Sequence, residues 1–273
     1  MKYRYLFASD MDFTLLMPGE DVTEENKKAI RLLRENGVAF TLATGRTFYL
    51  VRKFAASLDV DVPCITSNGG SLYDPKKFDE VYSVNIDETV ARDVFEMLLR
   101  RDIDFAGYSG EGIFFGPRNG RRDFFDKYNE GLKEEEKAPL YDFSLDMKPF
   151  PKFSKILVVG ADEETKAILR GNKDLECTMS TGVLMDLTAP GASKGNALLK
   201  LAEMLEIPEE NVFAAGDNDN DLSMLKAAPH SIAMGNSSDE IKACCEYVTT
   251  NCEENGLAKA VYDFILPRVR PSS

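Results

Sequence analysis

A short apolar segment that runs directly into two carboxylates constrains the fold of this chain more than any other feature. Tyr5 to Ala8 is apolar and partly aromatic, which is typical of a buried strand, and Asp10, Asp12 and Thr14 follow it at alternate positions. In open α/β sheets, ligand sites lie at the carboxyl ends of the strands. One Asp after a strand usually only starts a turn. Two carboxylates so close together repel each other, so the pair indicates a bound cation.

Three further strand-like segments also end in polar residues. They are Val38–Ala43 before Thr44-Gly45-Arg46, Val62–Thr66 before Ser67-Asn68-Gly69-Gly70, and Val212–Ala215 before Gly216-Asp217-Asn218-Asp219-Asn220-Asp221. Helical segments alternate with these strands, and such alternation is the signature of a parallel sheet covered by helices on both faces. The sequence therefore predicts an α/β fold with a doubly wound, Rossmann-like parallel sheet, whose polar strand ends converge on one rim.

The alternation stops near Ile86 and returns after Thr188. We interpret residues 1–85 and 189–273 as a catalytic core, and 86–188 as an inserted α+β cap domain. Every polar strand end described above lies outside the insertion, so the insertion is expected to select the substrate and to exclude water. Its candidates for substrate contact are the polar turns at 108–112 and 181–182 and the basic residues Arg118, Arg121 and Arg122, although a solvated surface explains these arginines equally well.

The composition excludes several classes of function. Lys and Arg total 33 against 46 Asp and Glu, a net charge of −13, which argues against a nucleic-acid partner because such binding depends on basic side chains. No run approaches the ~20 apolar residues of a membrane span, and the first residues do not read as an export signal. A cytoplasmic protein without a membrane partner is therefore expected. An EF-hand loop starting at Asp217 needs Glu at its twelfth position, where the sequence has Ala228, so a calcium loop is excluded.

The polar residues at the predicted rim suit phosphoryl transfer. They offer the carboxylates of Asp10, Asp12 and the 217–221 run, the hydroxyl of Thr44, and the ammonium group of Lys194 at the start of a helix. In phosphoryl transfer, positioning and charge neutralisation dominate. A carboxylate that attacks a phosphate dianion is repelled by roughly 4 kcal/mol per pair of unit charges at 4 Å and an effective dielectric constant of 20. Mg²⁺ and Lys194 are therefore expected as necessary partners.

These segments together resemble the haloacid dehalogenase (HAD) superfamily of phosphatases, specifically its Cof-like sugar-phosphatase branch with an inserted α/β cap of type IIB. The motifs that carry the resemblance are Asp10-Met11-Asp12-Phe13-Thr14, Ala43-Thr44-Gly45-Arg46, Asn68-Gly69-Gly70, Ser193-Lys194-Gly195 and Gly216-Asp217-Asn218-Asp219-Asn220-Asp221. One position departs from the pattern, since the family usually has Gly where this chain has Phe13. An aromatic ring there either narrows the entrance beside Asp12 or packs inward.

The resemblance implies a role for each motif residue. Asp10 is the nucleophile that becomes an aspartyl phosphate, and Asp12 is the general acid and base. Thr44 and Lys194 hold the phosphoryl oxygens. The implied Mg²⁺ site comprises the Asp10 carboxylate, the Asp12 backbone carbonyl, Asp217 and Asp221, the last of which also orients substrate or metal-bound water. The remaining substrate-binding residues are Gly45, Arg46, Asn68 and Asn220.

The predicted function is Mg²⁺-dependent hydrolysis of small phosphorylated metabolites, with sugar phosphates favoured, by a monomer or small homo-oligomer. Two alternatives use the same core: a phosphomutase, which hands the phosphoryl group to a second sugar hydroxyl, and a sensor that binds a phosphorylated metabolite without turnover. A receiver-type signalling domain also places acids, a Thr and a Lys around Mg²⁺. Receivers are about half as long as this chain and have no inserted cap, and likeness at the level of fold is only analogy.

Overall fold

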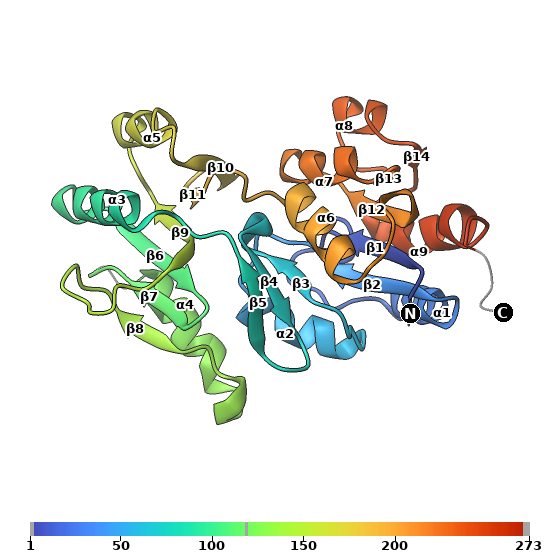
Figure 1. The fold of residues 1–273 in the computed structure, drawn as a ribbon, viewed down its shortest axis with the longest axis horizontal. Helices are drawn as coiled ribbons and strands as arrows, with labels where there is room; N and C mark the ends of the chain where they lie inside the picture. The colour runs from blue at the N-terminus through green and yellow to red at the C-terminus, as the bar shows by residue number, and fades with distance from the viewer. Residues whose placement is uncertain (1–2, 118–119, 270–273) are drawn as a thin grey trace. The chain divides into compact units, whose positions relative to one another are not determined.

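The computed structural model describes residues 3–117 and 120–269 (Figure 1). The chain forms two compact units, of which unit 1 comprises Met1–Tyr82 with Ser193–Ser273 and unit 2 comprises Ser83–Ala192. The predicted insertion, 86–188, is slightly shorter than unit 2 at both ends. Its role as a substrate-selecting cap stays a prediction. No helix in the described part of the chain has the length and apolarity that crossing a bilayer requires.

A parallel sheet forms the centre of unit 1, with strand order β14-β13-β12-β1-β2. Its strands are β1 (Tyr5–Ser9), β2 (Val38–Leu42), β12 (Val212–Gly216), β13 (His230–Ala233) and β14 (Tyr247–Val248). β1 pairs in parallel with both β12 and β2, so Ser9 lies beside Ala215 and Leu42. The residues that follow these three strands are therefore neighbours at one rim. The predicted α/β fold with a parallel sheet is confirmed.

The helices of unit 1 bury one apolar face, and α1, α6 and α8 begin at side-chain caps. They are α1 (Glu24–Glu35), α2 (Phe48–Ser57), α6 (Lys194–Met204), α7 (Leu222–Ala227), α8 (Asp239–Ala243) and α9 (Gly256–Ala260), which a turn of π-helix continues over Val261–Ile265. The hydroxyl of Ser193 accepts a hydrogen bond from Asn196 N at 3.1 Å. This cap satisfies one of the free N–H groups at the start of α6 and makes Lys194 its first residue.

A small antiparallel sheet lies beside the parallel one, with strand order β3-β4-β5. Its strands are β3 (Cys64–Thr66), β4 (Ser71–Asp74) and β5 (Asp79–Ser83). The sequence predicted β3 as a third parallel strand, yet its parallel contact is a single bridge between Ala43 and Ile65. The chain turns back after β3 because Ser67, Asn68 and Gly69 all have positive φ, at 53°, 56° and 93°. The hairpin of β4 and β5 was not predicted.

Unit 2 is built on a six-stranded sheet with order β10-β11-β9-β6-β7-β8. Its strands are β6 (Asp104–Ser109), β7 (Gly112–Phe115), β8 (Leu140–Asp142), β9 (Phe153–Val159), β10 (Glu176–Thr181) and β11 (Leu184–Thr188), and its helices are α3 (Glu88–Arg100), α4 (Gly120–Glu130) and α5 (Glu163–Arg170). Aromatic rings fill its core, with Phe95 5.0 Å from Phe105 and 4.9 Å from Phe153 between ring centroids. The sequence predicted neither β8 nor β10. Both are edge strands, which lack the apolar signal of buried strands.

Candidate active site

The polar residues predicted from the sequence gather around the carboxyl ends of β1, β2 and β12. Asp10 comes directly after β1, and its backbone N–H donates to Ala215 O at 2.9 Å, which ties it to β12. Thr44 follows β2, with its N–H bonded to Ile65 O at 2.9 Å. Asp217 is the first residue after β12. The parallel register thus brings together residues that lie about two hundred positions apart in the sequence.

A buried lysine joins two carboxylates at the centre of this rim. Lys194 Nζ donates to Asp10 Oδ1 and to Asp221 Oδ1, each at 2.6 Å. The side chains of Lys194 and Asp221 are fully buried, and that of Asp10 is 8% exposed. Burial by itself would lower the pKa of Lys194, but the two carboxylates raise it above its usual range. The lysine therefore stays charged, as a buried charge can only when it is paired.

The carboxylates at this rim carry more negative charge than one lysine neutralises. Burial, followed by the charge of Asp221, raises the pKa of Asp10 to about 8, although Lys194 acts in the opposite direction. Burial also raises the pKa of Asp217 to about 6, against a hydrogen bond from the Thr14 hydroxyl to Asp217 Oδ1 at 2.8 Å. Both shifts arise from the same cause: a buried carboxylate lacking sufficient positive charge around it. The site is suited to a cation.

The donor set fits Mg²⁺. One carboxylate oxygen from each of Asp10, Asp217 and Asp221 lies within 4.8 Å of the others, and Mg²⁺ prefers such hard oxygen ligands. Asp221 is engaged on both oxygens, because Oδ2 accepts from Asp217 N and Asn218 N at 3.0 and 3.1 Å while Oδ1 accepts from Lys194. Asp10 and Asp217 therefore have the freer oxygens, and Asp221 shapes the loop that presents Asp217.

Two glycines allow these loops to pack closely. A Cβ atom at Gly216 would lie 2.5 Å from Asp221 Cβ, so a side chain there would displace Asp221. A Cβ atom at Gly69 would lie 2.1 Å from Ser193 O. The left-handed turn at 67–69 therefore lies directly against the start of α6, and its backbone helps to place Lys194.

Arg46, Thr44, Gly45 and Asn68 form a second group of predicted residues. The Thr44 hydroxyl accepts from Arg46 N at 3.1 Å, and Asn68 N donates to Thr44 O at 3.0 Å. A Cβ atom at Gly45 would lie 2.8 Å from Asn68 Oδ1. The Arg46 guanidinium holds Asp12 with two hydrogen bonds, from Nε to Oδ2 at 2.9 Å and from Nη2 to Oδ1 at 2.5 Å. The sequence predicted Arg46 and Asp12 as site residues but not their pairing.

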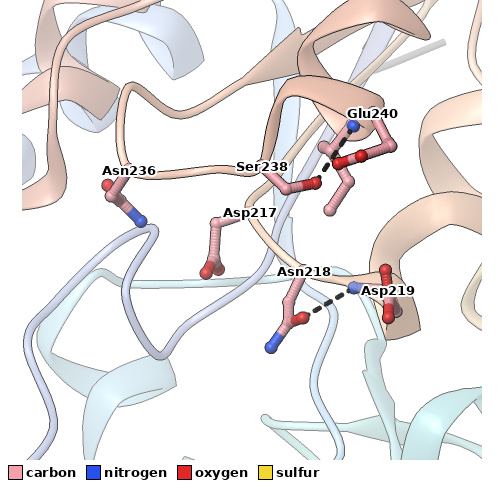
Figure 2. Close-up of a pocket in the computed structure, with 7 residues that line it drawn as sticks. Asp217, Asn218, Asp219, Asn236, Ser238 and Glu240 are labelled. Atoms are coloured by element: carbon pink, nitrogen blue, oxygen red, sulfur yellow. Dashed lines mark hydrogen bonds between the residues drawn. The ribbon is translucent and has the colours of Figure 1, made fainter.

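A pocket of about 500 Å³ opens beside Asp217, between the 217–219 loop and the start of α8 (Figure 2). Its lining is mostly polar and includes three acidic residues; it comprises Asp217, Asn218, Asp219, Asn236, Ser238, Glu240 and Ile241. Sequence reasoning missed Asn236. Its Nδ2 donates to Phe13 O at 3.0 Å, and its Oδ1 accepts from Cys252 N at 3.0 Å. The available sequence signal was that Asn236 follows strand β13, as other site residues follow their strands, but no recognised motif marks this strand end.

Phe13 is more exposed than large aromatic residues usually are, and its backbone conformation is unusual. Its φ is 62°, in the left-handed region, and it is 44% exposed. The alternative that Phe13 packs inward is therefore wrong. The backbone here has the conformation that glycine adopts without cost, and this explains why a glycine is usual at this position. The loop that carries Asp12 is held in this shape by the Asn236 contact and by Phe13 N, which donates to Leu16 O at 2.8 Å.

The remaining predicted residues lie apart from these contacts. Asn220 is in the 3₁₀ turn Asp219–Asp221, and its role stays a prediction. In unit 2, Arg122 pairs with Asp142, and the Arg121 guanidinium lies 4.7 Å from the Phe124 ring centroid. These contacts are those of an ordinary surface. Arg118 lies outside the described residues.

The fold and the site define a class. In this parallel α/β sheet, a lysine at a helix start lies between two carboxylates, with a third carboxylate and a hydroxyl at the neighbouring strand ends, and this is an arrangement for phosphoryl transfer. A family model described as haloacid dehalogenase-like hydrolase matches residues 7–261. The chain therefore belongs to the haloacid dehalogenase-like hydrolases. The predicted family and the predicted enzyme class, a HAD-type phosphatase, are confirmed.

Curated relatives and solved structures agree with this family. The chain is 31% identical to the 5-amino-6-(5-phospho-D-ribitylamino)uracil phosphatase YcsE of Bacillus subtilis, over 96% of each chain. It is 27% identical to the pyridoxal phosphate phosphatase YbhA of Escherichia coli, over 96% of this chain and 98% of the relative. A solved haloacid dehalogenase-like hydrolase from B. subtilis aligns with a TM-score of 0.79 at 27% identity, covering 95% of this chain and 99% of that one. The subclass IIB sugar phosphatase BT4131, at 20% identity and a TM-score of 0.79 over 96% and 99% of the two chains, shares the fold.

Proposed function

We propose that this protein is a Mg²⁺-dependent phosphatase that hydrolyses small phosphorylated metabolites through a phosphorylated Asp10. The observation that carries the proposal is the buried Lys194, which lies 2.6 Å from both Asp10 and Asp221 beside the carboxylate of Asp217. A charged lysine in contact with a carboxylate, next to further oxygen ligands, provides the positive charge that a phosphoryl group requires on its way to that carboxylate.

The metal would be held by the carboxylates of Asp10 and Asp217 and by the Asp12 backbone carbonyl, with Asp221 fixing the loop that presents Asp217. When bound, Mg²⁺ supplies positive charge that neutralises the transferring phosphoryl oxygens. Thr14 orients Asp217 through its hydroxyl, 2.8 Å from Oδ1. Among the described residues, no hydrogen bond reaches Oδ2 of Asp217, so this oxygen is available as a ligand.

The first chemical step transfers the phosphoryl group to Asp10. A carboxylate oxygen of Asp10 attacks phosphorus, and the bond from phosphorus to the leaving oxygen breaks with its electron pair moving to that oxygen. Asp12 gives the leaving oxygen a proton. Lys194 and the Thr44 hydroxyl hold the phosphoryl oxygens, because both are polar donors at the same rim as Asp10. The leaving alcohol then departs.

The second step returns Asp10 to its starting state. Asp12, now a carboxylate, takes a proton from a water molecule whose oxygen attacks phosphorus. The bond between phosphorus and the Asp10 oxygen breaks, and its electron pair returns to the carboxylate. Asp12 thus acts as the acid in the first step and as the base in the second, while Asp10 carries the phosphoryl group between them, which is why two carboxyl groups are needed.

The substrate class follows from the relatives and from the charge of the chain. The substrates in the two relatives' names are small phosphorylated metabolites, and we propose the same class here, with sugar phosphates as the first candidates. A net charge of −13 disfavours nucleic acid. We further propose that unit 2 selects the substrate, and that the protein acts in the cytoplasm as a monomer or small homo-oligomer, without a membrane partner.

Phosphate release from a panel of phosphorylated sugars, polyols, nucleotides and pyridoxal phosphate, with and without Mg²⁺, tests the proposal. Asp10→Asn keeps the shape of the side chain and removes its nucleophilic charge, so turnover should be lost. In H₂¹⁸O, a single turnover should place the label in released phosphate, because water attacks phosphorus. Wild-type turnover by Asp10→Asn, or a sugar product that keeps its phosphate on another hydroxyl, would contradict a phosphatase of this mechanism.

A further inference from the structure

The two hydrogen bonds between Arg46 and Asp12 conflict with the task of Asp12 in the proposed reaction. Arg46 Nε and Nη2 reach Asp12 Oδ2 and Oδ1 at 2.9 and 2.5 Å, so both carboxylate oxygens are occupied by the same guanidinium. A forked pair of this kind is the most specific geometry that arginine forms with a carboxylate. An acid held in this way has neither oxygen turned to a leaving group.

The contact between Arg46 and Asp12 can nevertheless open, because it is partly exposed to water. The side chains of Arg46 and Asp12 are 25% and 33% exposed, in contrast to the fully buried contact of Lys194 with Asp221. Water partly screens an ion pair with this much exposure, so breaking it costs less than breaking a fully buried pair. The Arg46 guanidinium also lies 5.6 Å from the Phe54 ring centroid, a contact with α2 that does not depend on Asp12.

Arg46 is anchored at the place where a phosphoryl group would bind. Its backbone N–H donates to the Thr44 hydroxyl at 3.1 Å, and Thr44 is a proposed phosphoryl contact. A phosphate dianion offers the same pair of oxygens to a guanidinium as a carboxylate does. Substrate and Asp12 therefore compete for one guanidinium.

We propose that Arg46 is an exchangeable latch on Asp12. Without substrate it holds both oxygens of Asp12, and when a phosphate ester binds, the guanidinium moves to the phosphoryl oxygens and frees Asp12 to face the leaving group. Arg46 is a positioning residue for Asp12 as well as a substrate contact. The acid becomes available only when a phosphoryl group is present. This inference rests on the proposed function.

A double-mutant cycle on phosphate binding tests the latch. The probe is inorganic phosphate, titrated calorimetrically in the presence of Mg²⁺ into wild type, Asp12→Asn, Arg46→Gln and the double variant. Asp12→Asn removes the competitor and should tighten phosphate binding roughly fivefold, the factor that corresponds to a partly exposed ion pair. In the Arg46→Gln background the same substitution should have no effect, because there is no guanidinium to release.

The cycle separates the latch from simple repulsion. If Asp12→Asn tightened phosphate binding equally with and without Arg46, the carboxylate would be repelling phosphate directly, and the latch would be refuted. Arg46→Lys keeps the charge but cannot form the fork, so the gain from Asp12→Asn should be smaller there than in wild type. A gain as large as in wild type would contradict the forked contact.

A matched control addresses net charge. Arg52 lies in α2, just after the segment that carries Arg46, with its guanidinium 4.2 Å from the Phe78 ring centroid, and Arg52→Gln should leave phosphate affinity unchanged. A loss equal to that of Arg46→Gln would show a general charge effect and overturn the inference. Failure of the proposed function looks different. A wild type that neither binds nor releases phosphate would refute both proposals, whereas an active enzyme with an additive cycle would refute the latch alone.

Discussion

Replacing Phe13 by glycine and by alanine separates backbone strain from the contacts of the ring. Both variants lose the same aromatic side chain. Because Phe13 is 44% exposed, each should lose only part of the roughly 1.5–3 kcal/mol that full burial of such a side chain contributes, or about 1–1.5 kcal/mol. The two variants differ in the backbone. With φ at 62°, alanine keeps a strain of roughly 1–2 kcal/mol that glycine does not have.

The net difference includes the unfolded chain. Glycine loses more conformational freedom on folding than alanine, which costs about 0.4–1 kcal/mol. Phe13→Gly should therefore be more stable than Phe13→Ala by about 0.5–1 kcal/mol, the reverse of the usual order. Thermal or urea unfolding of the two variants measures this. Phe13→Ala at least as stable as Phe13→Gly would refute the left-handed conformation.

The substrate profile is the second readout, and Phe78 is the control for it. Phe78 has φ of 58° and is 52% exposed, but it belongs to the turn between β4 and β5 and not to the Asp10–Thr14 motif. The same order of stability is expected for Phe78→Gly and Phe78→Ala, with no change in substrate preference. Phe13→Gly should broaden the profile toward bulkier leaving groups, because the ring stands next to Asp12. A Phe13→Gly profile identical to that of wild type would rule out a role at the entrance.

Three further predictions follow from the rim of the sheet. Asp217→Ala should raise the Mg²⁺ concentration needed for activity, while Lys194→Ala should lower turnover with little loss of Mg²⁺ affinity; equal metal titrations for Asp217→Ala and wild type would contradict this. The pKa values of Asp10 and Asp217 are raised from 3.8 to about 8 and about 6, so the folded state favours the protonated carboxyls. Their contribution to the free energy of unfolding is therefore complete below pH 3.8 and is lost as pH rises through 6 and 8. Metal-free protein should lose thermal stability across this range and Mg²⁺ should restore it, whereas a flat profile in EDTA would count against the buried charges. Gly69→Ala places a Cβ atom 2.1 Å from Ser193 O and should lower both stability and turnover. The control is Gly19→Ala, at a φ of 89° with nothing within 4 Å, which should lose only the roughly 1–2 kcal/mol of backbone strain. Equal losses of stability in the two variants would refute close packing at Gly69.

The sequence predicted the parts of the fold that have a local signal. Buried parallel strands read as continuous apolar runs, so β1, β2 and β12 were found, and the rule that their ends meet predicted that Asp10 and Asp217 are neighbours. The edge strands β8 and β10 were missed because a strand paired on one side requires no apolar face. The family resemblance predicted a turn at Asn68-Gly69-Gly70, but not that the chain reverses there through three successive left-handed residues, which no periodicity reveals.

Residue spacing predicted which side chains meet at the rim but not how they pair. Arg46 and Asp12 are both motif residues, yet their forked contact depends on side-chain conformations that spacing does not determine. Asn236 follows a strand end like the other site residues, but its role comes from a hydrogen bond to the backbone carbonyl of Phe13, which several donor side chains could form. A hydrogen bond to a backbone group is hard to predict from sequence, because every residue type carries the same backbone carbonyl.

The acids around Lys194 outnumber it, and this leaves negative charge at the rim that attracts a cation. Lys194 donates to both Asp10 and Asp221, and the other carboxylate oxygen of Asp221 accepts hydrogen bonds from two backbone N–H groups. If Asp221 were absent, Lys194 would contact Asp10 alone and the pair would be neutral, with less attraction for a cation. Because Lys194 also pairs with Asp221, it does not fully neutralise Asp10, whose pKa is raised first by burial and then by the charge of Asp221. On this argument Asp221→Asn should weaken Mg²⁺ binding without removing a metal ligand, whereas loss of a ligand is the reason expected for Asp217→Ala.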